Sequence, residues 1–137
     1  MAPRYDAQVT ALGGRDGAAL SSDGRLRVEM TDQPRRKGAD PSGISPEHLF
    51  AAGFATSFLA AIYMAAAACR KTLAADSNVT ATLSNRPRNE GGATLDLSID
   101  LPNFSTVEAA ALVERAREYC LFIEAMQDKI DIGFDIA

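Results

Sequence analysis

Ser57 is the first residue whose type suggests chemistry, because it lies inside the otherwise apolar segment LFAAGFATSFLAA at residues 49–61. A nucleophilic serine needs a general base within hydrogen-bond reach, usually a histidine. The only histidine is His48, nine residues earlier. In a continuous helix these two residues lie about 13 Å apart along the axis and on different sides. Since Ser57 also lacks the G-x-S-x-G setting of many hydrolases, the sequence argues against a serine hydrolase.

Metal and phosphate chemistry are not indicated either. One histidine and two distant cysteines, Cys69 and Cys120, give no ligand set with a recognisable spacing. The segment GGRDG at residues 13–17 has neither the spacing nor the strand-to-helix setting of a phosphate-binding loop. We therefore expect no metal and no cofactor. The two cysteines permit redox chemistry without showing it.

Length and composition indicate an ordinary soluble globular protein. The 137 residues are 47% hydrophobic and 23% charged, and this size predicts a single domain over residues 1–137. A net charge of −4 argues against nucleic acid as a partner. The one basic cluster, at residues 35–37, is interpreted as part of a solvated loop. The first ten residues lack the apolar core of a signal peptide, so we expect a cytoplasmic location.

A membrane span must be weighed for residues 49–69, which carry no charge and are long enough to cross a bilayer. Nine of these 21 residues are alanine, however, so the segment is only weakly hydrophobic. A helix that is apolar on all sides is equally typical of the centre of a globular fold. The strand patterns on both sides need such a shared core, and we expect no membrane insertion.

The elements that must position these residues follow from periodicity and turn signals. The first half predicts strands at 5–12 and 26–30 in a small antiparallel meander, with a turn at 21–24 and a long loop at 33–45. Ser45, Pro46 and Glu47 then form a strong helix start. The helix is expected to run from 46 to Lys71.

The second half predicts a hairpin followed by helices and a final strand. The expected elements are strands at 78–84 and 94–101 around a turn at 85–92, a helix opened by the Ser105–Glu108 capping box, a short helical stretch from Cys120 to Gln127, and a strand at 130–136. The residues expected on the inner face of the first of these helices are Val107, Ala111, Leu112 and Ala116. This order indicates an α+β fold, with antiparallel sheets packed on buried helices.

Several motifs together resemble the organic hydroperoxide resistance proteins of the Ohr/OsmC superfamily. They are GGRDG and SSDG near the start, SPEHLFAAGFATSF at 45–58, NEGGATLDLSIDLP at 89–102, REYC at 117–120 and the closing IDIGFDI strand. The resemblance runs nearly end to end. It implies an OsmC/Ohr-like fold with a long central helix, and an intertwined homodimer with two active sites at the interface.

The resemblance also implies a reaction, the thiol-dependent reduction of organic hydroperoxides. A reactive cysteine in the central helix attacks the peroxide, and a second cysteine resolves the resulting sulfenic acid as a disulfide that lipoyl-type dithiols reduce. By position, Arg15 matches the arginine that holds the thiolate, and Glu47 matches the acid before the central helix. Cys120 matches the resolving cysteine, whereas Ser57 occupies the position of the attacking one.

Serine at that position removes the group that begins the family reaction, because a hydroxyl is far less acidic than a thiol and has no comparable oxidation ladder. Cys69 is about 18 Å further along a regular helix and does not replace it; we expect it to be a small buried residue. Glu47 lies about 15 Å from Ser57 in an unbroken helix, so it reaches the site only by holding Arg15. An ordinary surface pairing of Arg15 with Glu47 is the alternative.

Three interpretations of function remain open. The chain is an enzyme that acts through Cys120, or a working peroxidase into which Ser57 was introduced. Alternatively, it is a non-catalytic module that binds a lipid-like or aromatic molecule in an apolar pocket lined by Phe54, Phe58 and Phe122, with Arg15 holding the ligand's oxygens. The third interpretation is an inert structural relative.

Overall fold

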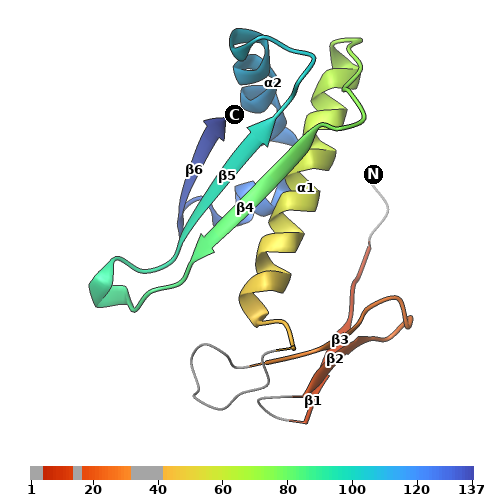
Figure 1. Ribbon diagram of the computed structural model, residues 1–137, viewed down its shortest axis with the longest axis vertical. Helices are drawn as coiled ribbons and strands as arrows, with labels where there is room; N and C mark the ends of the chain where they lie inside the picture. Colours follow the sequence, from red (N-terminus) through yellow and green to blue (C-terminus); the bar gives the residue numbers. More distant parts are fainter. Residues whose placement is uncertain (1–4, 14–16, 32–41) are drawn as a thin grey trace. The chain divides into compact units, whose positions relative to one another are not determined.

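A computed structural model of the chain describes residues 5–13, 17–31 and 42–137. These residues group into two compact units, residues 1–49 and 50–137, which are treated separately below (Figure 1). Arg15, the basic cluster at 35–37 and most of the predicted loop at 33–45 lie outside the described residues. The expectation of one domain over 1–137 stays a prediction.

The first unit contains an antiparallel sheet of three strands, β1 (Val9–Leu12), β2 (Ala18–Ser21) and β3 (Arg27–Glu29). The predicted meander is therefore present, but the sequence missed β2. That strand reads AALS and lies between two turn signals, so it offers no alternation of apolar and polar residues. β1 also starts at Val9, later than the predicted residue 5.

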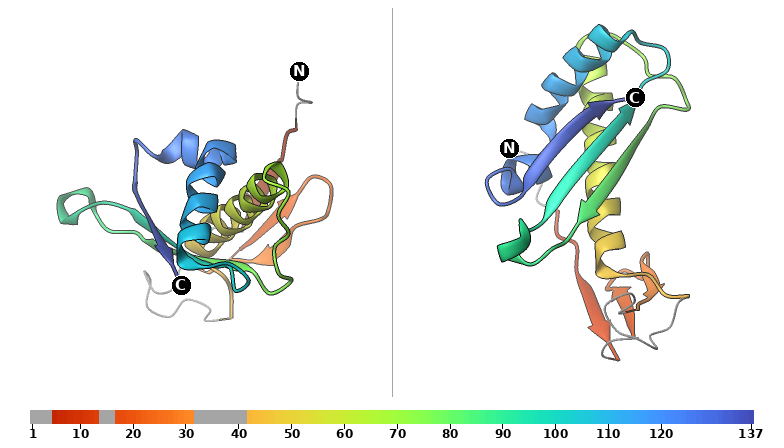
Figure 2. Two further views of the ribbon diagram at one scale, coloured as in Figure 1. Left: turned by 90° about the horizontal axis from the view of Figure 1, so that it is seen from above. Right: turned by 60° about the vertical axis from the view of Figure 1, so that its left-hand side comes forward.

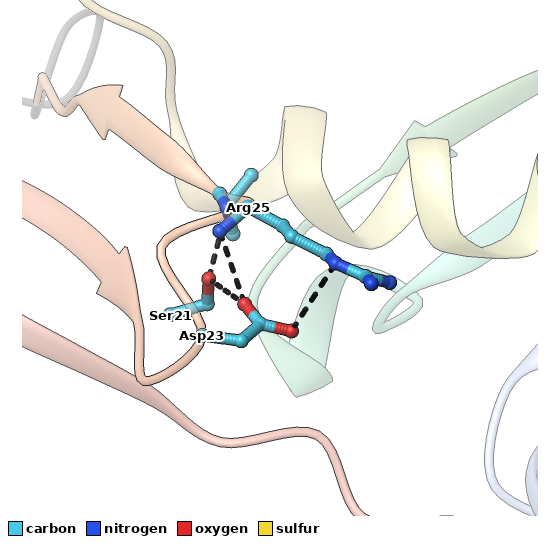
Figure 3. Close-up of polar contacts among 4 residues, drawn as sticks. Ser21, Asp23 and Arg25 are labelled. Carbon is cyan, nitrogen blue, oxygen red and sulfur yellow. Dashed lines mark hydrogen bonds and ion pairs between the residues drawn. The ribbon is translucent and has the colours of Figure 1, made fainter.

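The predicted turn at residues 21–24 is confirmed, and a small polar network holds it (Figure 3). The Ser21 hydroxyl donates to the Asp23 carboxylate at 2.6 Å, and the backbone N–H of Arg25 donates to the same oxygen at 3.0 Å. These two hydrogen bonds lower the pKa of Asp23 below its ordinary value, and the bond from Ser21 has the larger effect. The network closes the connection between β2 and β3.

Helix α1 (Pro46–Ala68) begins with a reciprocal cap in which histidine takes the place that glutamate has in the usual capping box. The backbone N–H of Ser45 donates to His48 Nδ1 at 3.0 Å, and the Ser45 hydroxyl lies 2.8 Å from the same atom. The backbone N–H of His48 points back to the Ser45 hydroxyl at 3.4 Å. His48 thus has a structural task at the helix start.

The second unit is built on β4 (Asn78–Ser84), β5 (Thr94–Asp100) and β6 (Asp131–Ile136). β4 and β5 form the predicted antiparallel hairpin, but β6 pairs with β5 in parallel. The expectation of antiparallel sheets is therefore wrong for this pair, and the sheet is mixed. The long connection between β5 and β6, which includes two helices, permits the parallel arrangement. The predicted bounds of all three strands hold to within one residue.

Helices α1 and α2 (Thr106–Tyr119) cover one face of this sheet (Figures 1 and 2). The core between the layers contains the alternating residues Leu95, Leu97 and Ile99 of β5, each fully buried. The inner side of α1 supplies Phe54, Phe58, Ala61, Ile62, Ala65 and Ala66. The mixed α+β fold with a long central helix is therefore confirmed.

Among the described residues, one side of α1 is buried and the other is exposed. Tyr63 and Met64, on its other side, are 48% and 52% exposed. By length and composition α1 is the one helix of the described part that is apolar enough to cross a membrane. Its inner side nevertheless belongs to the core of the second unit, as expected for a central helix.

The predicted capping box of α2 is confirmed, but its inner face is not the predicted one. The Ser105 hydroxyl accepts the Glu108 N–H at 3.2 Å, and the Glu108 carboxylate accepts the Ser105 N–H at 3.0 Å. Val107 lies in the first turn and is 80% exposed. The buried residues of α2 are Ala109, Leu112, Val113 and Ala116, so Val107 and Ala111 were misassigned. Helix α3 (Leu121–Met126) follows as expected.

The C-terminal end of α1 is the source of one stability prediction. The helix ends at Ala68 instead of Lys71, because Arg70 adopts a left-handed backbone with φ 58°. The N–H groups of Arg70 and Lys71 reach back to Ala67 and Ala66, as in a Schellman motif, whose turning residue is usually glycine. Arg70→Gly should raise the free energy of unfolding by about 1 kcal/mol, because a Cβ in this conformation is strained.

The measurement is urea unfolding at one fixed protein concentration. Arg70→Ala is the matched control, since alanine removes the same charge but keeps the Cβ. Equal stability of these two variants would show that the left-handed backbone at Arg70 carries no cost.

Candidate functional site

Ser57 and Cys120 come into contact across the second unit. The Ser57 Oγ lies 3.5 Å from the Cys120 Sγ, a distance at which either atom can donate a hydrogen bond to the other. The two residues are 63 positions apart in the sequence. Ser57 is half-buried, and Cys120 is 1% exposed. The contact therefore places a half-buried hydroxyl next to a thiol that is shielded from water.

The break between α2 and α3 positions Cys120. This residue closes α2 and opens α3, and its backbone is extended, with φ −93° and ψ 107°. Ala116 before it and Ile123 after it are both buried, so the junction is anchored on both sides. Ser57 lies in the middle of α1, where regular helix geometry fixes its direction. Ser57 is thus held within a helix, and Cys120 at the junction of two helices.

An aromatic cluster adjoins this pair one helical turn earlier on α1. Phe54 is 2% exposed, and its ring packs on Phe50 at 5.1 Å and on Phe122 of α3 at 5.4 Å between centroids. Phe122 itself remains 45% exposed. A Cβ placed on Gly53 would come within 3.3 Å of the Phe122 ring. The glycine thus allows the close approach of α3 to α1.

Gly53 is a residue of this region that is absent from the predicted site. Glycine inside a helix weakens it slightly. An isolated glycine in a helical pattern is also a signal of close packing, and that signal was available from the sequence. In the structure, the absence of a side chain at Gly53 leaves room for the Phe122 ring.

Phe58 belongs to the core of the second unit. It is fully buried, and its ring packs on Phe134 of β6 at 5.4 Å between centroids. The guanidinium of Arg117 lies over the same Phe134 ring at 4.7 Å. Of the three phenylalanines that the sequence assigned to a pocket, Phe122 therefore has the largest exposed surface, and their role as pocket residues stays a prediction.

The structure does not test the placement of the other predicted site residues relative to Ser57. Arg15 lies outside the described residues, and Glu47 belongs to the first unit. The roles assigned to these two residues stay predictions. Cys69 follows the last residue of α1 and is partly exposed, so the expectation that it is buried was wrong. The helix ends at Ala68, directly before this residue.

Comparison with known proteins gives one family and a set of full-length relatives. Residues 38–135 match the family described as OsmC-like protein. An organic hydroperoxide resistance protein of Xanthomonas axonopodis pv. citri is 32% identical over 97% of this chain and 94% of its own length. The organic hydroperoxide resistance protein OhrA of Bacillus subtilis is also 32% identical, over 98% of this chain and 97% of its own.

Solved structures agree over the whole chain. The organic hydroperoxide resistance protein OhrB of Bacillus subtilis superposes with a TM-score of 0.85 at 29% identity, covering 97% of this chain and 98% of that one. A putative organic hydroperoxide resistance protein of Vibrio cholerae, solved with captopril in one of its active sites, gives a TM-score of 0.86 at 28% identity. That match covers 99% of this chain and 94% of the other.

Proposed function

Because this chain belongs to the OsmC-like family and its relatives are organic hydroperoxide resistance proteins, we propose that it acts in the response to organic hydroperoxides through the site of Ser57 and Cys120. The observation that carries the proposal is the 3.5 Å contact between Ser57 Oγ and Cys120 Sγ. This is the approach that an attacking and a resolving group need. Peroxide turnover by the chain itself is nevertheless reduced or lost.

The missing step is the first one. In thiol-dependent peroxide reduction a thiolate attacks one peroxide oxygen, the O–O bond breaks, and the thiolate becomes a sulfenic acid. The Ser57 hydroxyl does not ionise near neutral pH and does not form such a product. The Cys120 thiol has the right chemistry, but it is 1% exposed and so meets peroxide poorly. The site keeps the geometry of the reaction without its nucleophile.

Arg15 and Glu47 complete the proposed site by orienting the substrate oxygens, the arginine directly and the glutamate by holding the arginine. Lipoyl-type dithiols serve as the reductant only in a form of the protein that turns over. These assignments rest on the matching motifs GGRDG and SPEH in the sequence.

A homodimer in the cytoplasm is part of the proposal. The exposed apolar side of α1, with Tyr63 and Met64, supports association with a second copy. Val9 and Leu12 of β1 are also large, apolar and about half exposed. A second chain that covers such surfaces would remove them from water.

Binding of an apolar small molecule without turnover is the second candidate. The half-exposed ring of Phe122, packed edge-on against Phe54, offers an aromatic surface next to the Ser57–Cys120 pair. The relative from Vibrio cholerae holds captopril in an active site, which supports ligand binding on this scaffold. Phe54 and Phe58 form the buried base of the proposed pocket.

The chain with Ser57 should consume tert-butyl or cumene hydroperoxide with a lipoyl-type dithiol no faster than the dithiol alone, because position 57 carries no thiol. The measurement is peroxide loss over time at several protein concentrations. Cys120→Ser is the matched variant. Turnover that survives this substitution would contradict the proposal, and turnover that disappears with it would assign the attack to Cys120.

A further inference from the structure

A polar cleft lies in the second unit and shares no residue with the site of Ser57 and Cys120. Its volume is about 480 Å³, within the range of small-molecule sites. One wall is the connection between β4 and β5, at residues 86–93, and the other is the connection between α3 and β6, at residues 127–131. The sequence predicts only a hairpin turn, at residues 85–92, for the first of these segments.

The parallel pairing of β5 with β6 creates this cleft. Thr94 at the start of β5 stands opposite Asp131 at the start of β6. Because β5 and β6 run in the same direction, the segments that precede them lie at the same end of the sheet (Figure 2, right). If β6 were antiparallel to β5, the C-terminus would lie at this end of the sheet instead.

The first wall has a fixed backbone. Gly91 and Gly92 have φ values of 107° and 71°, which residues with a Cβ rarely adopt, and the N–H of Gly92 bonds the carbonyl of Pro87 at 3.1 Å. A Cβ placed on Gly91 would lie 3.9 Å from an Nη atom of Arg86. The guanidinium of Arg86 therefore lies along the turn, at the cleft.

Charge is the property that points to a ligand. The cleft is lined by three cations, Arg86, Arg88 and Lys129, and by two carboxylates, Asp128 and Asp131. Within the described part of the chain, the side chains of these five residues form no ion pair or hydrogen bond with one another or with other residues. Cations that share a cleft with carboxylates and still do not pair leave their donors available to an anion.

We propose that this cleft binds a small phosphate ester. The two guanidinium groups and the lysine ammonium hold the phosphate, since arginine forks match its oxygens in pairs. The carboxylates of Asp128 and Asp131 accept hydrogen bonds from hydroxyl or ammonium groups at the other end of the ligand. The charges are exposed, so the affinity should depend on salt.

The test is a titration of the ¹⁵N-labelled full chain at constant ionic strength, followed by amide chemical shifts, with chloride, inorganic phosphate, malonate and glycerol 3-phosphate as probes. Both phosphates should give saturable shifts confined to residues 86–93 and 127–131, with the glycine amides of the turn among the largest. Glycerol 3-phosphate should bind more tightly than inorganic phosphate.

The double variant Arg86→Gln/Arg88→Gln should weaken phosphate binding at least about tenfold, whereas the matched control Arg25→Gln/Arg115→Gln, with the same change of charge, should not. Asp128→Asn/Asp131→Asn should abolish the preference for glycerol 3-phosphate. The spectra report the folding of each variant. Shifts that do not saturate, that chloride or malonate reproduces equally, or that survive loss of both arginines would overturn the proposal.

Discussion

Ser57→Cys should convert the chain into an organic hydroperoxide reductase with a rate at least about a hundredfold above that of the chain with Ser57. Removing the nucleophile from an established catalytic unit costs up to ~10⁶ in rate, so restoring it to a site that is otherwise in place should recover a measurable part. The introduced thiol would lie next to Cys120, at the position from which Ser57 Oγ now contacts Cys120 Sγ at 3.5 Å. The measurement is loss of tert-butyl hydroperoxide with a lipoyl-type dithiol.

Thr56→Cys is the matched control for this gain. Thr56 is the neighbouring residue of α1 and is exposed, and its hydroxyl bonds the carbonyl of Ala52 at 2.8 Å. A thiol at position 56 would lie on the same helix but away from the contact with Cys120, so it should not support turnover. If a folded Ser57→Cys variant is inactive, or if Thr56→Cys is equally active, the assignment of position 57 as the site of attack is wrong.

Local rules predicted the parts of the fold that local chemistry decides. The Ser105–Glu108 capping box could be predicted from the sequence because both of its hydrogen bonds join residues only three positions apart. The parallel pairing of β6 was not, because a strand pattern specifies which face is buried and says nothing of direction. β2 was missed for a related reason: pairing on both sides stabilises a strand whose own four residues show no alternation.

The same distinction between local and long-range features applies to the candidate site. Nothing in the spacing of Ser57 and Cys120 predicts their contact, because tertiary packing brings α1 to the junction of α2 and α3. The pairing was expected only from the resemblance to hydroperoxide resistance proteins. Gly53 shows why such packing is hard to read from sequence, since its importance depends on Phe122, a residue far along the chain.

The contact between Ser57 and Cys120 places a thiol introduced at position 57 within reach of a second thiol. In the Ser57→Cys variant one equivalent of organic hydroperoxide should produce a disulfide between position 57 and Cys120. The introduced thiolate attacks the peroxide, an S–O bond forms, the O–O bond breaks, and the alcohol leaves. The Cys120 thiolate then attacks that sulfur, the S–O bond breaks, and water leaves. A separation of 3.5 Å is short enough to close to the usual S–S length of about 2.0 Å with small side-chain rotations.

Intact mass under non-reducing conditions is the measurement, and the oxidised variant should be about 2 Da lighter than its reduced form, with its peptides joined at these two positions. Cys69, at the partly exposed end of α1, is the internal reference and should stay free. Adding Cys120→Ser should remove the disulfide and leave a sulfenic acid that dimedone traps, because the resolving group is then absent. A disulfide to Cys69, or one between two chains, would show that Cys120 is not the partner of position 57. Trapping of the sulfenic acid in equal yield with and without Cys120 would show that the contact, although close, does not resolve it.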